Sequence, residues 1–526
     1  MKDENTTKRT NSTYRRRFLT TVSAAGALGL AGCIADSGSG DGSSSGSSGG
    51  SLPSRQEGVQ TWGERINSYA KQADIDWKQF EGTKLRMGMN SHPFTDATQP
   101  LLPYFKDLTG IDVTYDVYAE SDLWNKLRTQ LSNEQSTYDG FFMGLWPSAQ
   151  YYEAGYPKNL SEYANDPEIS DRKWFHWEDF TENALKSFTY QGDLSSIPFG
   201  VEPYGCLAYD KPTFEKVGVS EPTNFDELED VARKISQSDE VERAAIGSRA
   251  SSTPLSTANW ASMFRSYGAD WISYTKQEAE LNSQQGIAAL EKFATLMGDY
   301  GPADIGSFDW TQNIQTYGQG QLAMAYVTAS VVGSIPQAQR ERTKWLPPLE
   351  GPNGDRVAAN WQWGLGISEF SNDPKATWLL LQWLTCRPGQ LYTSSPQWEG
   401  QPFYGWARNK WLFDQSEFRP GNLGENWQET FNEGMSLVPA TPPAVPLDVP
   451  QNMDIMSEVA TAMNSAVTGT PANKVLNNAA PSITRIAEQI PDAYIEPYRG
   501  NREPGGSVPN GTDNSTTGNS TGNSTQ

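Results

Sequence analysis

Apolar and polar positions alternate with two different periods over residues 84–131. Residues 84–89 form a short run with the composition of a strand, and residues 111–118 alternate with a period of two, which also indicates a strand. Between them, apolar residues recur at helical spacing over 96–108, and Gly110 supplies a helix end. Residues 123–131 repeat leucine every four positions, as on one face of a second helix.

A third, largely apolar strand is predicted at 138–145. The order strand, helix, strand, helix, strand favours parallel pairing with right-handed crossovers, and therefore an α/β fold class. In open sheets of this kind ligands bind beyond the carboxyl ends of the strands. The loops at 90–92 and 146–148 are predicted to lie there.

The pattern changes at residue 196, where a segment punctuated by proline and glycine continues to residue 211. Such an extended segment can cross between two lobes. A helix is then predicted from Pro222, with Thr223 or Asn224 as its N-cap and acids in its first turn. Further helices are predicted at 260–267 and 284–297, and a buried strand at 320–327.

The N-terminus has the features of an export signal. Residues 15–19 read Arg-Arg-Arg-Phe-Leu, which fits a twin-arginine pattern, and the weakly apolar run at 18–32 is too short to span a bilayer. Leu-Ala-Gly-Cys at 30–33 has the form of a lipobox, so Cys33 is predicted to carry a lipid. The alternative is a buried apolar helix. We therefore predict a twin-arginine lipoprotein signal peptide over 1–33.

Low-complexity segments flank the central region. Residues 34–60, rich in Ser and Gly, are predicted to be a flexible tether, and residues 500–526 a disordered tail of Asn, Ser and Thr. The tail holds the sequons of Asn510, Asn514, Asn519 and Asn523, which suit a glycosylated surface tail; the alternative is a tail without sugar.

Charge and composition exclude several functions. A net charge of −22 argues against nucleic acid or an anionic lipid surface as the main ligand. The acids are scattered, as in proteins that work in high salt, and with the export signal they suggest a halophilic archaeon. No HExxH, CxxC or Gly-rich phosphate loop occurs, so we predict neither a metal nor another cofactor.

Two residue types leave open questions. Cys206 and Cys386 can form one disulfide or remain two buried thiols, and the spacing does not decide between them. Aromatic residues make up 11 % of the chain, including 18 Trp, which is unusual in a hydrophilic protein and needs a functional explanation.

An ordered set of motifs carries a resemblance to a known family. They are Ile-Pro-Phe-Gly-Val at 197–201, Leu-Ala-Tyr-Asp-Lys at 207–211, the segment 222–228, Tyr-Gly-Gln-Gly-Gln-Leu-Ala-Met at 317–324, Trp-Gly-Leu-Gly-Ile-Ser at 363–368, and the segment 463–470. In this order, over residues 82–491, they resemble the extracellular solute-binding proteins of sugar ABC importers, the family that includes maltodextrin-binding protein.

The resemblance implies a two-lobed periplasmic-binding-protein-like fold of type II, with each lobe a central sheet flanked by helices and a ligand cleft at a hinge. Lobe 1 would hold residues 83–200 and 364–440, and lobe 2 residues 201–363 and 441–495. It implies a monomer without enzymatic activity, anchored by lipid outside the cytoplasmic membrane. The protein would pass a carbohydrate ligand to a permease driven by a cytoplasmic ATPase.

Sugars present apolar C–H faces and many hydroxyl groups, so a site for them pairs aromatic rings with carboxylates and amides. Two residues, Trp361 and Trp363, are spaced to point the same way on a strand and are expected to form one flat wall. A lower-ranked rim cluster lies at 398–406. The ligand-binding candidates are Asn90, His92, Trp146, Glu202, Tyr204, Asn259, Trp260, Trp310, Trp361 and Trp363.

Each candidate also has a structural interpretation: core packing for Trp146, Trp361 and Trp363, core or surface packing for Asn259, Trp260 and Trp310, a loop cap for Asn90 and His92, and hinge stabilisation for Glu202 and Tyr204. At the level of the whole chain, a secreted glycoside hydrolase is the alternative. It would need two carboxylates about 5–10 Å apart, which the abundance of acids allows, although no hydrolase signature accompanies them. An adhesion lipoprotein is disfavoured because we find no internal repeat.

Overall fold

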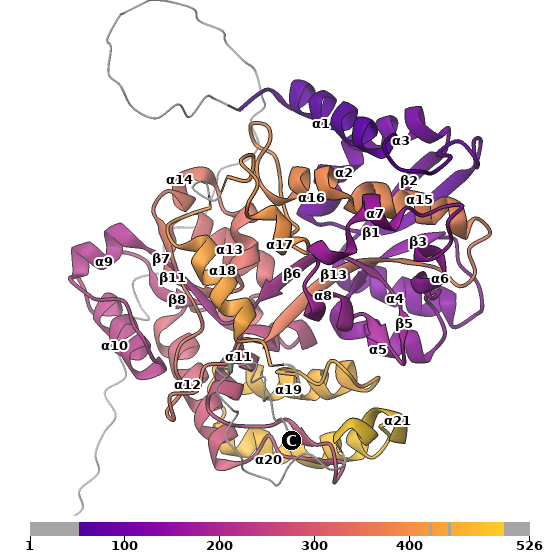
Figure 1. Ribbon diagram of the computed structural model, residues 1–526. Helices are drawn as coiled ribbons and strands as arrows, with labels where there is room; N and C mark the ends of the chain where they lie inside the picture. The colour runs from indigo at the N-terminus through magenta and orange to yellow at the C-terminus, as the bar shows by residue number, and fades with distance from the viewer. Residues whose placement is uncertain (1–51, 420–422, 440–442, 499–526) are drawn as a thin grey trace, which may run out of the picture. The chain divides into compact units, whose positions relative to one another are not determined.

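The computed structural model describes residues 52–419, 423–439 and 443–498 (Figure 1). The predicted signal peptide, Cys33, most of the tether and the tail from residue 500 lie outside these ranges. Residues 52–60 of the predicted tether are described, and the last six of them, 55–60, begin helix α1 (Arg55–Ala70). The tether prediction is wrong for these six residues, because Ser54 and Glu57 form a capping box that starts the helix.

Five strands form the first sheet, in the order β2, β1, β3, β13, β6. Both neighbours of β1, which are β2 and β3, run parallel to it, as the sequence predicts, whereas β13 runs antiparallel to β3 and β6. The predicted α/β fold class is therefore confirmed in this sheet. The strands are β1 (Lys84–Asn90), β2 (Asp112–Tyr118), β3 (Gly140–Gly144), β6 (Ile197–Pro203) and β13 (Asn360–Ile367).

The single helix predicted over 96–108 is instead three short segments, α2 (Pro93–Thr98), η2 (Gln99–Leu101) and α3 (Leu102–Thr109). Pro100 and Pro103 each lack a backbone N–H and would crowd the carbonyl four residues earlier, so a continuous helix breaks before each of them. The chain leaves α3 through Gly110, whose φ of 74° is left-handed as expected.

Helices that follow the strands of the first sheet pack against it. Helix α4 packs on β1 and β2, α5 on β3, and α15 on β6 and β13. The remaining elements of this region are α4 (Glu120–Leu131), α5 (Leu145–Glu153), α6 (Leu160–Ala164), α7 (Arg172–Phe175), η3 (Trp177–Asp179), α8 (Glu182–Lys186), β4 (Thr189–Tyr190), β5 (Asp193–Leu194), α15 (Pro374–Thr385), α16 (Arg387–Ser394), α17 (Asn409–Leu412) and α18 (Trp427–Ser436).

Four strands form the second sheet, in the order β12, β7, β11, β8, with β8 and β11 parallel to each other. Its strands are β7 (Cys206–Asp210), β8 (Ala244–Gly247), β11 (Leu322–Val327) and β12 (Thr343–Leu346). The predicted strand at 320–327 is confirmed as β11, and the predicted helices at 260–267 and 284–297 correspond to α11 and α12.

Helices flank the second sheet as well, and the C-terminal α19 and α20 pack on α12 (Figure 1). These elements are α9 (Lys211–Val217), α10 (Phe225–Ser236), η4 (Pro254–Thr257), α11 (Ala258–Ser266), β9 (Ile272–Ser273), β10 (Glu278–Ala279), α12 (Gln284–Tyr300), η5 (Ile305–Ser307), α13 (Trp310–Gly318), η6 (Ala329–Ser334), α14 (Gln337–Arg340), α19 (Asn452–Val467), α20 (Ala472–Ala487), α21 (Asp492–Ile495) and η8 (Glu496–Tyr498).

Three chain segments meet between the sheets. The Tyr204 N–H donates a 2.7 Å hydrogen bond to the Ala359 carbonyl, and the Ala358 N–H donates one of 3.1 Å to the Leu437 carbonyl. The lobe boundaries expected after residues 200 and 363 fall inside β6 and β13.

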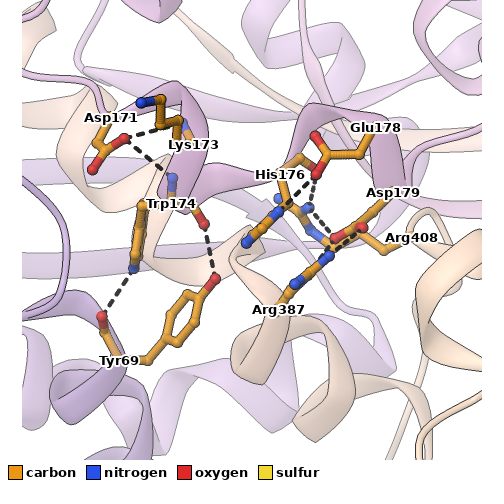
Figure 2. Close-up of polar contacts among 9 residues, drawn as sticks. All are labelled: Tyr69, Asp171, Lys173, Trp174, His176, Glu178, Asp179, Arg387 and Arg408. Carbon is orange, nitrogen blue, oxygen red and sulfur yellow. Dashed lines mark hydrogen bonds and ion pairs between the residues drawn. The ribbon is translucent and has the colours of Figure 1, made fainter.

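A buried ion cluster joins η3 to the helices that follow β13 (Figure 2). The Asp179 carboxylate accepts two hydrogen bonds of 2.8 Å from Arg387 and one of 3.1 Å from Arg408. Arg408 is fully buried between the rings of Phe175 and Phe180, and burial lowers its pKa to about 10. The cluster therefore holds two guanidinium groups on one carboxylate.

Cys206 and Cys386 are both buried and free, so of the two alternatives the structure has the pair of thiols. Across the described ranges, no helix is both long enough and apolar enough to cross a membrane.

Candidate functional site

A cavity of about 730 Å³ lies where the loops of both sheets converge, and a recess of about 50 Å³ adjoins it. From the first sheet, its walls come from the segments that follow β1, β2 and β3, which are parallel strands. From the second sheet they come from the segments that follow β8 and β11, also parallel. Carboxyl ends of strands thus face the cavity from both sides, where ligands bind in open α/β sheets.

The recess is floored by the two strands that lie next to each other at the crossing. Trp361 on β13 pairs in register with Glu202 on β6. Trp361 and Trp363 lie on one side of β13 with ring centroids 4.8 Å apart, but their planes meet at 72°. The expectation of a flat wall is therefore wrong, because the two rings pack edge to face, as aromatic pairs prefer.

Gly144, the last residue of β3, allows this packing. A Cβ atom at residue 144 would lie 2.8 Å from the Trp361 ring, 2.9 Å from Trp124 and 3.1 Å from Trp363. No side chain fits there without displacing the rings, so the shape of the recess depends on this glycine.

The Glu202 carboxylate is held by hydroxyl groups from two separate segments. The Tyr404 hydroxyl donates a 3.0 Å hydrogen bond to Oε1, and the Ser330 hydroxyl donates to Oε2. Burial raises the pKa of Glu202, and these hydroxyls together with the nearby Arg249 charge partly oppose that rise. Glu202 therefore anchors Tyr404 and the loop after β11 at the base of the recess.

Arg249 supplies a positive charge from the second sheet. Its Nη2 donates to the Tyr204 hydroxyl at 3.1 Å and its Nη1 to the Leu255 carbonyl at 3.1 Å. The side chain is 8 % exposed and lines both the cavity and the recess. These two bonds fix the direction of the guanidinium.

Glu120 faces the cavity from the first sheet. It is the first residue of α4 and also lines both the cavity and the recess. The walls of the cleft desolvate its carboxyl group and raise its pKa to about 7, while Arg249 opposes the rise and Glu202 adds to it.

His92 caps α2 and also lines the cavity. Its Nδ1 accepts a 3.2 Å hydrogen bond from the Phe94 N–H, and its ring lies 4.5 Å from Tyr404 and 5.4 Å from Trp363. Burial lowers the pKa of His92 to about 3, so the ring is neutral near pH 7. The loop-cap interpretation of His92 is correct, and the side chain belongs to the cleft as well.

Three cavity-lining side chains keep a buried polar atom without a hydrogen-bond partner among the described residues. They are Asn90 Oδ1, Trp124 Nε1 and Trp361 Nε1. Buried polar groups in proteins are almost always paired, so unpaired acceptors and donors on side chains that line one cleft are candidate partners for a polar ligand. No cluster of His, Cys, Asp or Glu suited to a metal ion occurs in the part of the chain that the structure describes.

The structure places most of the predicted ligand-binding residues in one place. Seven of the ten line the cavity or its recess: Asn90, His92, Glu202, Tyr204, Trp310, Trp361 and Trp363.

The other three predicted residues lie elsewhere. Trp146 is buried behind Trp361, with ring centroids 5.5 Å apart. Asn259 donates to Ser248, and Trp260 packs among the rings of the α11 and α12 core. For these three, the packing interpretation describes what the structure shows.

Several residues of the cleft were not found from the sequence. Glu120 and Trp124 follow β2, and the rule that placed ligand contacts after β1 and β3 would have found them if it had been applied to β2. Arg249 follows β8, a strand of four residues whose pattern was not recognised. Tyr404, by contrast, was predicted from the sequence as part of the lower-ranked rim cluster, and it lines the recess.

Comparison with known proteins gives a consistent result. A family model described as "Bacterial extracellular solute-binding protein" matches residues 91–390. The erythritol/L-threitol-binding protein of Mycolicibacterium smegmatis is 25 % identical over 336 residues, which cover 59 % of this chain and 68 % of that protein.

Solved structures share the fold. A solute-binding protein of Agrobacterium vitis with bound D-mannitol superposes with a TM-score of 0.67 at 20 % identity, covering 78 % of this chain and 100 % of the other. Maltose-bound MalE3 of T. maritima gives a TM-score of 0.65 at 18 % identity, covering 77 % and 100 %. These are two-lobed periplasmic binding proteins, so the predicted fold class is confirmed.

Proposed function

Because the chain belongs to the family of bacterial extracellular solute-binding proteins, we propose that it binds a neutral, hydroxyl-rich solute in this cleft and leaves it chemically unchanged. The solute class is a sugar or a polyol. Its relative in Mycolicibacterium smegmatis is named for two polyols, and the two solved neighbours hold a polyol and a disaccharide. These names support the class and do not choose within it.

The observation that carries the proposal is the set of unpaired polar atoms beside aromatic rings. Asn90 Oδ1 can accept a hydrogen bond, and the indole nitrogens of Trp124 and Trp361 can donate one. A hydroxyl group is both donor and acceptor, so a polyhydroxy compound can satisfy all three atoms. Trp310, half-buried on the cavity wall, offers a ring face for the C–H surface of such a compound.

We further propose that the two sheets belong to two lobes that close on the solute. Lobe 1 comprises residues 83–200 and 364–440, and lobe 2 residues 201–363 and 441–495. The backbone bonds of Tyr204 to Ala359 and of Ala358 to Leu437 lie where the chain passes between the sheets. Few residues need to change their dihedral angles at such a crossing, which makes it a suitable hinge.

The proposed solute is delivered to the permease of an ABC importer with a cytoplasmic ATPase. The lipobox at 30–33 supports an anchor at Cys33, which would hold the protein on the outer face of the cytoplasmic membrane. Capture without catalysis is part of the same proposal, and a secreted glycoside hydrolase is the outcome that would replace it.

A thermal-shift screen with chemical analysis of the solute tests the proposal. Erythritol, ribitol, D-mannitol, maltose and maltotriose are each added to the purified protein, and the mixtures are then separated by chromatography. A ligand that binds only the folded state raises the melting temperature in proportion to the logarithm of its concentration. We expect such a rise with at least one compound and full recovery of that compound. Release of glucose from maltose or maltotriose would mean that the protein is a hydrolase.

A further inference from the structure

Glu120 has the position of a ligand-binding residue. It follows β2 at the carboxyl edge of the first sheet and lines the same recess as Asn90 and Trp361. Its carboxylate makes no hydrogen bond or ion pair with any side chain that the structure describes. Asn90 and Trp361 line this recess and are each 2 % exposed, and each has a buried polar atom without a hydrogen-bond partner among the described residues.

An acid in the first turn of a helix has a simpler explanation, because it interacts favourably with the helix dipole. In α4 that role is available to Asp122, which is exposed to solvent. Glu120 instead faces the cavity together with Trp124, which lies four residues later on the same side of the helix. The cleft thus receives a carboxylate and an unpaired indole N–H from adjacent turns of α4.

The charges that face Glu120 come from several elements. Arg249 stands on the opposite wall, and its guanidinium is already bonded to Tyr204 and Leu255. The acidic residues that line the cavity and its recess are Asp96, Glu120, Glu202 and Asp309, the basic ones are Arg128 and Arg249, and His92 is neutral. The acids outnumber the bases by two (4 − 2 = 2).

We propose that the Glu120 carboxylate binds the solute directly, by accepting hydrogen bonds from two neighbouring hydroxyl groups, and that it makes the cleft select uncharged over anionic polyhydroxy compounds. This inference rests on the proposed function. Two carboxylate oxygens can bridge two hydroxyls on adjacent carbons, and a hydrogen bond to a charged group is stronger than one between neutral groups. An added negative charge on the solute would face the excess of carboxylates in this partly exposed cleft, where repulsion between like charges is only partly screened.

The ionised form of Glu120 is the form that accepts both hydrogen bonds. Since its pKa in the free protein is about 7, solute affinity falls as the pH is lowered through this value. A structural role for Glu120 would change stability without producing this dependence. A glutamine at residue 120 keeps the size of the side chain and removes both the charge and the titration.

The experiment measures the dissociation constants of D-mannitol, erythritol and maltose by isothermal titration at pH 6 and pH 8. It compares the wild type with Glu120→Gln and with Asp122→Asn, a matched control on the same helix turn. D-Mannitol 1-phosphate and D-gluconate serve as anionic probes. For the neutral probe that binds the wild type most tightly, we expect Glu120→Gln to weaken binding about 10- to 100-fold at pH 8.

Two further results are expected. Wild-type affinity falls about tenfold from pH 8 to pH 6, whereas the affinity of Glu120→Gln stays constant. The preference of the wild type for neutral over anionic probes shrinks in Glu120→Gln and is kept in Asp122→Asn. If Glu120→Gln and the wild type bound a neutral probe with equal affinity, the proposed role of Glu120 would be overturned, whereas the proposed function would stand. If the wild type bound none of the neutral probes, both this inference and the proposed function would fall.

Discussion

The hydroxyl group of Tyr404 donates a 3.0 Å hydrogen bond to Oε1 of Glu202 at the base of the cleft. The bond joins the loop after α16 to the end of β6, while Ser330 holds the other carboxylate oxygen from the loop after β11. Gly200 makes the contact possible, because a Cβ atom there would lie 2.1 Å from the Tyr404 ring. One buried carboxylate thus connects elements that pack on different sheets.

Replacing Tyr404 with Phe tests this connection. The ring remains, but Glu202 loses a donor while it stays buried, so we expect the free energy of unfolding to fall by about 1–3 kcal/mol. Urea unfolding followed by tryptophan fluorescence measures the change. Tyr163→Phe is the control, because that hydroxyl makes no hydrogen bond with another described residue. Equal stability of the two variants would show that the bond to Glu202 contributes nothing.

Glu120→Gln is expected to bind solute more weakly and yet to be more stable at high pH. The folded-state pKa of about 7 exceeds the ordinary value of 4.5, so the folded protein binds more protons than the unfolded chain between these values. Wild-type stability therefore falls as the pH rises from 4.5 to 7. At pH 8 we expect Glu120→Gln to exceed the wild type by about 1–3 kcal/mol, with no difference at pH 4. A destabilised variant at pH 8 would contradict this.

His92 should give the opposite dependence on pH. Its pKa falls from 6.5 to about 3 on folding, so the unfolded chain binds more protons between these values. Stability is then lost as the pH is lowered from about 6.5. In His92→Asn the asparagine can still cap α2, but it does not titrate. We expect the stability of this variant to fall less than that of the wild type between pH 7 and pH 5, measured by chemical unfolding. Parallel curves would mean that His92 is not protonated differently in the two states.

Much of the fold follows from the sequence because its local patterns agree with the final packing. The strands near 84, 112 and 140 have apolar runs between clear helix signals, and Gly110 ends α3 as expected. Pro100 and Pro103 are helix-breaking signals that the helical periodicity of 96–108 obscured. The edge-to-face packing of Trp361 and Trp363 depends on Gly144 of another strand, which no local pattern reveals.

The binding site was harder to predict from the sequence than the fold, because it too depends on contacts between residues that are far apart in the chain. Trp260 and Trp361 are both buried tryptophans, and only the three-dimensional arrangement separates the core residue from the one that lines the recess. Arg249 becomes recognisable only when β8 and β11 are paired, since its place at a strand end depends on that pairing. Glu120 could have been predicted from the sequence, and Tyr404 was predicted only as a member of the lower-ranked rim cluster.

The indole nitrogen of Trp361 should matter more for binding than that of Trp363. Trp361 Nε1 is buried and unpaired in the described structure, so a solute hydroxyl is its expected partner. Trp361→Phe keeps an aromatic ring and removes this donor, and we expect D-mannitol or maltose to bind about tenfold more weakly. Trp363→Phe is the matched control on the same strand. A larger loss of affinity in Trp363→Phe than in Trp361→Phe would show that Trp363, and not Trp361, makes the polar contact with the solute.

The cluster of Asp179, Arg387 and Arg408 (Figure 2) should contribute to the stability of the fold without affecting solute binding in the cleft. Asp179→Ala leaves Arg387 and Arg408 without their shared carboxylate, and one of these cations is fully buried. We expect the free energy of unfolding to fall by about 3–5 kcal/mol. Glu178→Gln, at an exposed neighbouring position, should change it by less than about 1 kcal/mol. Comparable losses in the two variants would show that burial of the cluster has no special role.

Isothermal titration of the wild type and of the double variant Glu202→Gln/Trp361→Phe with erythritol, D-mannitol and maltose tests the central claim most directly. If the cleft binds a neutral, hydroxyl-rich solute, the wild type binds at least one of the three with a stoichiometry of one. The double variant, shown to be folded by circular dichroism, then binds the same solute at least 100-fold more weakly. Unchanged binding by the folded double variant would place the solute elsewhere, and absence of binding by the wild type would exclude all three compounds as its solute and contradict the proposed class.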